Sequence, residues 1–246
     1  MSTIDRTLPS EVHGPQRPLD LTPLGDGDGP PVGRQLPFWP VAGILGSAAG
    51  FGASLAALSS GVTEEQAQEG AGVIDHLERT NFHVAFILGL VSVVALFVAG
   101  AGWRRWAERR APDSLAARTI GTGITATATI NVVFTALAGS MALYLPGGTD
   151  HGWLSKEAMF VNFTLLDFGS LLGWWGVAVA AMAAAALAFG RQRLLPRWLG
   201  VAAVLLLALP LVTAAITGLP GLVGLTMPIW LTVASIGMVF SRRAGA

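Results

Sequence analysis

Long runs without charged side chains dominate the pattern of this chain. Five runs are bounded by charged residues or by the end of the apolar pattern: 35–63, 80–103, 119–149, 158–190, which is broken only by Asp167, and 198–241. A helix needs about 20 largely apolar residues to cross the hydrocarbon core of about 30 Å, so each of the first four runs predicts one span. The fifth is twice as long, and the turn sequence Gly218-Leu219-Pro220-Gly221 at its centre divides it into two.

The sequence therefore predicts an all-α fold, a polytopic membrane helical bundle with six transmembrane helices. The expected spans are about 37–58, 82–102, 119–144, 159–189, 198–217 and 222–241, within a transmembrane domain over 37–243. A membrane barrel would instead show segments of about ten residues with alternating polarity. Residues 1–36 are rich in Pro and Gly and poor in apolar side chains, which predicts a disordered cytoplasmic tail.

Composition supports the membrane interpretation. The chain is 52% hydrophobic and 12% charged, whereas soluble domains carry about 25% charged residues. This excludes an ordinary soluble enzyme. Lys plus Arg equals Asp plus Glu at 15 each, so no basic excess indicates nucleic-acid binding. The absence of cysteine excludes disulfides, thiolate metal sites and cysteine nucleophiles.

The arginines predict the orientation of the chain. They gather on one side of the expected membrane: Arg104, Arg105, Arg109, Arg110, Arg118, Arg191, Arg193, Arg197, Arg242 and Arg243. The opposite side has only Arg79 and Lys156. The positive-inside rule then places both termini in the cytoplasm of a multi-pass membrane protein. On the outer side, Thr63-Glu64-Glu65-Gln66 predicts the capped start of a short helix.

Two features concern the inside of the bundle. The first expected span carries Gly43, Gly46 and Gly50 on one face, which predicts close packing of a neighbouring helix. Asp167 is the only carboxylate inside an apolar span, and such a group is costly enough to indicate a function. It lies roughly 33 Å along a helix from Phe189, which places it in the outer third of the membrane. A purely structural, hydrogen-bonded carboxylate is the alternative.

Further polar residues are expected at the depth of Asp167. Thr127, Asn131 and Thr135 form a stripe at helical spacing that suits a helix interface and a wet cavity equally well. Asn162, His83 and Thr217 lie near the outer ends of their spans. We therefore predict an outward-facing polar pocket or ligand site formed by Asp167, Asn131, Asn162, His83 and Thr217, with these neighbours as hydrogen-bond donors to Asp167. Helix ends also collect polar residues for solvation alone.

Metal and cofactor chemistry has little support in the sequence. His76 and His83 are seven residues apart, but two histidines do not make a metal site. No pair of histidines lies in two different spans, as bis-histidine haem ligation would require. The Gly-x-x-x-x-Gly-Lys-Ser/Thr, His-Glu-x-x-His and Gly-x-Ser-x-Gly motifs are all absent. We therefore expect no metal and no cofactor.

Two segments carry a family resemblance. Leu165-Leu166-Asp167-Phe168-Gly169, and Leu195-Pro196-Arg197-Trp198-Leu199-Gly200 at the start of the fifth span, resemble a group of uncharacterised bacterial six-span membrane proteins that share a domain of unknown function. The resemblance covers about residues 37–243 and implies a helical inner-membrane protein without an assigned reaction. High Ala, Gly and Arg usage with a single lysine looks actinobacterial.

Three function classes remain. The sequence favours a non-enzymatic protein in the lipid bilayer that binds a small ligand or lipid, or serves as a subunit or modulator of a membrane complex or homo-oligomer. A small transporter or channel is the first alternative, although no broken helix or inverted repeat is evident in the sequence. A membrane-embedded enzyme using Asp167 or His83 is the second.

Overall fold

The structure is a computed structural model that describes residues 38–58, 62–191 and 193–240. The predicted tail over residues 1–36 lies outside the described residues, as do Arg242 and Arg243. The described part of the chain is helical and contains no strand. This confirms the predicted all-α fold.

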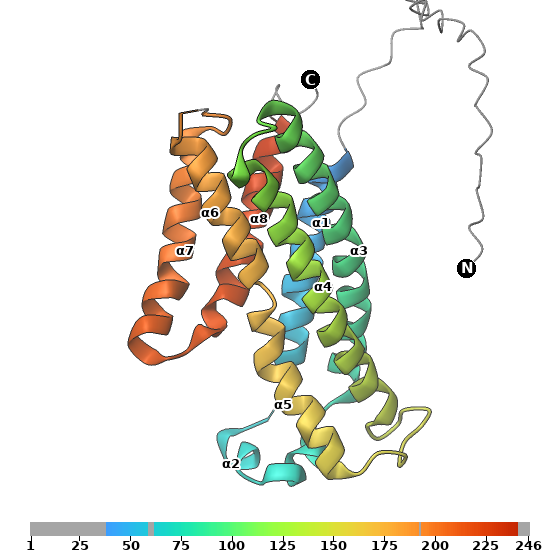
Figure 1. Ribbon diagram of the computed structural model, residues 1–246. Coiled ribbons are helices and arrows are strands. Elements are labelled where there is room, and N and C mark those ends of the chain that lie inside the picture. The colour runs from blue at the N-terminus through green and yellow to red at the C-terminus, as the bar shows by residue number, and fades with distance from the viewer. Residues whose placement is uncertain (1–37, 59–61, 192, 241–246) are drawn as a thin grey trace, which may run out of the picture. The chain divides into compact units, whose positions relative to one another are not determined.

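The long helices run roughly along one axis (Figure 1). Their bounds are α1 Phe38–Leu58, α3 Arg79–Arg110, α4 Leu115–Tyr144, α5 Lys156–Leu172, α6 Trp175–Phe189, α7 Arg197–Thr217 and α8 Val223–Phe240. Among the described residues, six segments are long and apolar enough to cross a membrane, with α5 and α6 together forming the fourth of them, Lys156–Phe189. The predicted helical membrane bundle is thus confirmed in its class and in its number of spans.

The connection between α1 and α3 contains two short helical elements, α2 (Glu64–Ala67) and the 3-10 helix η1 (Gly70–His76). The predicted cap is present, since the Gln66 backbone N–H donates to Thr63 Oγ1 and the Thr63 N–H donates to Gln66 Oε1. Gly70 has φ 61°, a left-handed conformation that suits glycine and separates α2 from η1. The Val73 and Ile74 side chains of η1 are buried in a hydrophobic cluster that ties this connection to the bundle.

The small residues of α1 permit close packing, as predicted. A Cβ atom on Gly46 would lie 3.0 Å from the Leu96 backbone nitrogen of α3. A Cβ on Gly50 would lie 2.6 Å from both Ser92 Oγ and the Trp174 ring. Each glycine therefore holds a neighbour at a distance that a larger side chain would prevent.

The connection between α7 and α8 is the predicted tight turn. Gly218 ends α7 with φ 73°, and the 3-10 helix η2 (Pro220–Leu222) leads into α8. The start of α8 packs on the end of α5, because a Cβ on Gly224 would lie 2.6 Å from the Leu171 Cα. In Figure 1, α5 continues beyond this connection.

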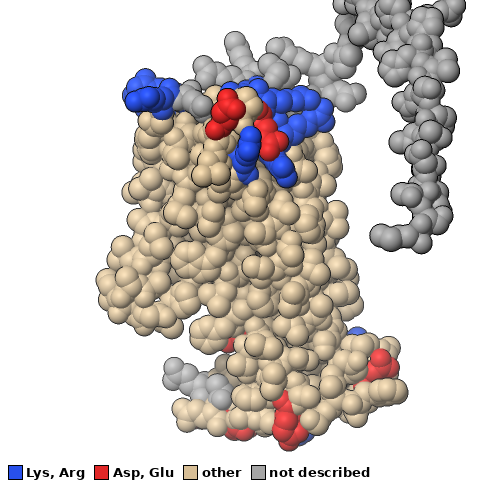
Figure 2. Space-filling model, viewed as in Figure 1, with Lys and Arg blue, Asp and Glu red and all other residues tan. Residues whose placement is uncertain are grey.

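Charged side chains are concentrated at the two ends of the described bundle. Figure 2 shows Lys and Arg gathered at one end, a wide band without charge, and mostly acidic side chains at the other end. The basic end includes Arg104 and Arg118, which flank the connection between α3 and α4, and the opposite end includes Asp75 paired with Lys156. This distribution fits helices whose middle lies in hydrocarbon.

Candidate functional site

The fourth span is interrupted at Gly173 and Trp174, between α5 and α6. The sequence analysis expected one uninterrupted span here, and the structure corrects this. Two glycines at the interruption lie close to α4: a Cβ on Gly173 would lie 2.5 Å from the side-chain oxygen Asn131 Oδ1, and a Cβ on Gly176 would lie 2.4 Å from the Gly123 carbonyl oxygen. Helix kinks commonly occur at such glycines.

An interrupted helix leaves backbone groups without their usual partners, and hydroxyls from two other helices take their place. The Val177 N–H of α6 donates to Thr127 Oγ1 of α4 at 2.9 Å, in a buried contact. The Ser170 carbonyl of α5 accepts a hydrogen bond from Ser54 Oγ of α1 at 3.4 Å. Unsatisfied backbone groups cost several kcal/mol in hydrocarbon, so these bonds allow the interruption to exist inside a membrane.

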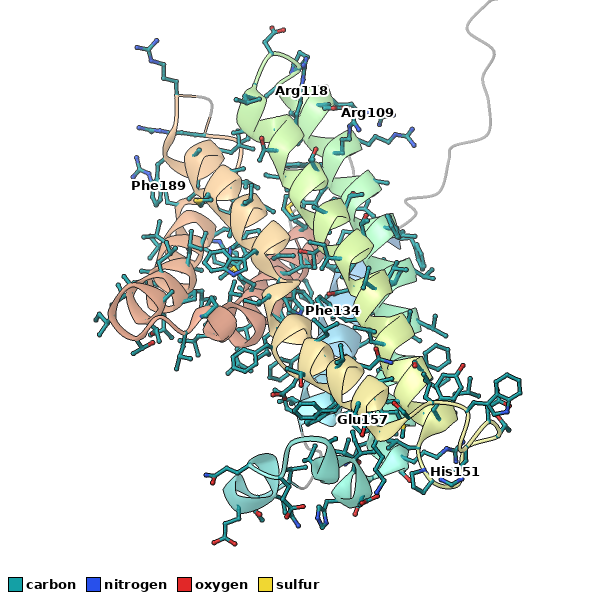
Figure 3. The ribbon with its side chains drawn as sticks, turned by 60° about the horizontal axis from the view of Figure 1, so that its bottom comes forward. Arg109, Arg118, Phe134, His151, Glu157 and Phe189 are labelled. Carbon is teal, nitrogen blue, oxygen red and sulfur yellow. The ribbon has the colours of Figure 1, made fainter. Side chains whose placement is uncertain are left out.

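A cavity of about 30 Å³ lies beside this interruption, between α1, α3, α4 and α5. Its walls are mostly small or apolar residues. The polar residues that line it are Ser54, Ser92, Asn131, Thr135 and Ser170. Phe134 also lines it. In Figure 3, Phe134 lies between the end of the bundle with Arg109 and Arg118 and the end with His151 and Glu157. The cavity is therefore inside the bundle, away from both charged ends.

Asn131 is the most informative residue of the cavity. Its side chain is only 8% exposed, and Thr135, one turn further along α4, is 7% exposed. Neither the Asn131 amide nor the Thr135 hydroxyl makes a hydrogen bond with any residue that the structure describes. By contrast, Ser92 Oγ donates to the Gly46 carbonyl at 2.7 Å. The three residues of the predicted stripe on α4 therefore have two roles. Thr127 hydrogen-bonds across a helix interface, whereas Asn131 and Thr135 line the cavity.

Asp167 lies one residue beyond Leu166, whose side chain lines the cavity, but Asp167 itself does not line it. Its side chain is partly buried. Its carboxylate makes no hydrogen bond or ion pair within the described part of the chain. No hydrogen bond from the expected candidate donors Asn131, Asn162, His83 or Thr217 to Asp167 is present among the described residues. Consecutive helical residues point about 100° apart, so Leu166 and Asp167 of α5 do not share a direction.

The remaining predicted site residues lie apart from the cavity. Asn162 Nδ2 donates to Ser140 Oγ at 3.3 Å and so links α5 to α4. His83 is exposed on α3. Thr217 is exposed at the end of α7, where its hydroxyl donates to the Thr213 carbonyl at 2.8 Å. The structure thus brings Asn131 to a polar cavity and does not gather the five predicted residues around it.

The two histidines seven residues apart do not share a helix. His76 ends η1, Leu77 is extended, and α3 begins at Arg79. The His76 ring lies 3.3 Å from the Glu69 carboxylate instead. In the ranges 38–58, 62–191 and 193–240, no group of three or more His, Asp or Glu side chains is placed to hold a metal ion.

Sequence reasoning did not identify Ser92 and Ser170 as cavity residues. Both are small residues in apolar helices, and their role depends on which helices meet, which periodicity along one helix does not reveal. The signal for the interruption was present as Gly173-Trp174-Trp175-Gly176, two bulky residues between two glycines.

No family model matches the chain, and neither the curated proteins nor the solved structures contain a match to it. The resemblance to uncharacterised bacterial six-span proteins therefore stays a prediction.

Proposed function

We propose that this chain is a non-enzymatic integral protein of a bacterial inner membrane that binds a small polar solute in the cavity between α1, α3, α4 and α5. One observation carries the proposal: Asn131 is more than nine-tenths buried, lines the cavity, and its side chain makes no hydrogen bond to any described residue.

Energetics favour a bound polar species over a purely structural role for Asn131. A buried amide without a partner costs about 1–3 kcal/mol relative to a satisfied one. A leucine of similar size would avoid that cost in an apolar bundle. Thr127 on the same helix shows a structural polar residue, because its hydroxyl is fully buried and hydrogen-bonded to Val177. A solute that bonds to Asn131 and Thr135 accounts for the difference.

Access from the outer side follows from the orientation that the arginines predict. The walls of the cavity include residues of α5 and none of α6. α5 leads to the end of the bundle with Lys156 and Asp75, and α6 leads to the basic end near Arg191. With the basic end in the cytoplasm, the cavity belongs to the outer half of the fourth span.

A small transporter is a second candidate, and the interrupted fourth span favours it. Transporters place substrate and ion sites at discontinuous helices, where backbone and side-chain oxygens face a cavity. An enzyme has less support, since neither Asp167 nor His83 lines the cavity.

Silver-ion access to a single cysteine tests the proposed site. The chain has no cysteine, so every thiol signal reports the introduced one. In proteoliposomes in nitrate buffer, we expect Ag⁺ to block Thr135→Cys, and the remaining thiols are counted with maleimide after unfolding in detergent. Only a thiol that water reaches ionises and reacts.

Two matched variants on α4 serve as controls. Ala128 is fully buried and does not line the cavity, and Ile130 is exposed on the outside of the described bundle. Ala128→Cys and Ile130→Cys are expected to stay unblocked under the same conditions. If Ag⁺ left Thr135→Cys as unreacted as Ala128→Cys, the cavity would be closed to water and the proposed solute site would be wrong.

A further inference from the structure

We infer that the solute is a monovalent metal cation of about the size of Na⁺, coordinated by side-chain oxygens of Asn131, Thr135, Ser54 and Ser170. The inference rests on the proposed function and names the chemical class of the ligand. It uses three observations on the cavity: its volume, the charge of its walls, and the helix end that it faces.

The volume excludes most solutes. A cavity needs about 10–15 Å³ of this kind of volume to hold one water molecule, so the observed 30 Å³ or so accommodates about two water-sized species. An amino acid, sugar or nucleoside does not fit. Water, or a small ion with one water, does.

The walls select among small species by charge. Their polar side chains are hydroxyls and one amide, and no described Lys, Arg, His, Asp or Glu lines the cavity. An anion prefers cationic side chains or several N–H donors, and the walls offer only the N–H groups of the Asn131 amide, since the Val177 N–H already donates to Thr127. A divalent cation prefers carboxylates. Neutral oxygens that replace a hydration shell are the chemistry by which proteins bind alkali cations.

The local field also favours a cation. α5 contributes Leu166 and Ser170, which belong to its last two turns, and the C-terminal end of a helix carries a partial negative charge. Asp167 lies between these two residues in sequence and is paired with no described cation. Outside the apolar band, Glu65 adds a negative charge at the same end of the bundle, where Asp75 is paired with Lys156 and Glu69 lies beside His76.

Thermal unfolding of the purified full chain in detergent tests the inference. We compare NaCl, KCl and LiCl with choline chloride at constant total salt, so that screening is held fixed. Binding to the folded state alone stabilises it in proportion to the logarithm of ligand concentration. We expect the unfolding midpoint to rise with Na⁺ concentration, by roughly 5 °C or more at about 100 times the dissociation constant, and not to rise with choline.

Three variants sharpen the test. Asn131→Leu and Thr135→Val keep side-chain size, remove cavity oxygens, and are expected to abolish or strongly weaken the Na⁺ dependence. Thr129→Val is the control, since its exposed hydroxyl donates to the Thr125 carbonyl of its own helix, and it should keep the dependence of the wild type. If Asn131→Leu does not fold, Thr135→Val and Ser54→Ala give the same readout.

The outcomes separate the two proposals. Equal unfolding midpoints in all four salts would overturn the inference that the solute is a cation. If Ag⁺ still blocked Thr135→Cys, the occupant of the cavity would be water or a neutral solute. Unchanged Na⁺ dependence in both Asn131→Leu and Thr135→Val would also overturn the inference, because the cation would then bind elsewhere. A cysteine closed to Ag⁺ would overturn the proposed site itself.

Discussion

The Thr127 hydroxyl of α4 lies 2.9 Å from the Val177 backbone nitrogen of α6 and accepts its hydrogen bond across two helices. In a continuous helix this N–H would donate to the carbonyl four residues earlier, at Gly173. The side chain of one span therefore replaces a backbone bond that the interruption of another span has removed. The interruption of the fourth span therefore depends on a hydroxyl side chain at position 127 of α4.

Removing this hydroxyl should destabilise the protein. Thr127→Val leaves a buried N–H without a partner, so we expect the free energy of unfolding to fall by about 1–2 kcal/mol, measured by detergent or thermal unfolding. Thr127→Ser, which keeps the hydroxyl, should restore most of it. Thr129→Val should change it by less than about 0.5 kcal/mol because that side chain is exposed. Wild-type stability of Thr127→Val would contradict the role of this bond.

The approach of α4 and α6 gives a second prediction. A Cβ on Gly176 would lie 2.4 Å from the Gly123 carbonyl oxygen, a backbone atom that cannot move without shifting a helix. We expect Gly176→Ala to lower the free energy of unfolding by about 2 kcal/mol or more. Gly52→Ala is the matched control, since its Cβ would meet only the end of the Leu88 side chain at 3.1 Å. Similar stability of the two variants would show that α4 and α6 are further apart than in this structure.

Asp167 should contribute little to stability. Its carboxylate makes no hydrogen bond within the described part of the chain, so Asp167→Ala and Asp167→Asn should each change the free energy of unfolding by less than about 0.5 kcal/mol. Loss of its negative charge should instead raise the Na⁺ concentration that is needed for a given rise of the unfolding midpoint. A large loss of stability in both variants would show that Asp167 has a structural partner after all.

The orientation can be measured in cells with the same cysteine-free background. The exposed Gln68 follows α2, and Glu108 lies in the last turns of α3 at the basic end of the described bundle. We expect a membrane-impermeant maleimide to label Gln68→Cys in intact cells, and to label Glu108→Cys only after permeabilisation. The reverse pattern would invert the predicted topology.

The span count and the helical class were predictable from sequence because they depend on local properties. Runs of apolar residues long enough for a bilayer identify spans, and Gly218 to Gly221 marks a turn whether or not its surroundings are known. The capping pattern at Thr63 is equally local and is present in the structure. The close approach at Gly46 and Gly50 was visible as a small-residue face.

The candidate site depended on contacts between helices. Asn131 was identified from its type and depth, but nothing local separates it from Thr127, four residues earlier, which became a hydrogen-bond partner of α6. The position of a residue along its span gives its depth and leaves its direction around the axis open. For this reason His83 and Thr217, which were grouped with Asn131 by depth, lie exposed on the outside of their helices.

The interruption at Gly173 has a mechanical consequence. Backbone atoms of Gly123 and Gly176 hold α6 against α4, so α6 cannot slide or rotate unless α4 moves with it. α5 contacts α4 differently, since Gly169 packs on the Phe134 ring, which can turn to another rotamer. The two halves of the fourth span are therefore held by different contacts: α6 by the backbone of α4, and α5 by the Phe134 ring, by the hydrogen bonds of Ser170 and Asn162, and by α8 at Leu171. Because α5 supplies a wall of the cavity and α6 does not, the shape of the cavity depends on the contacts of α5.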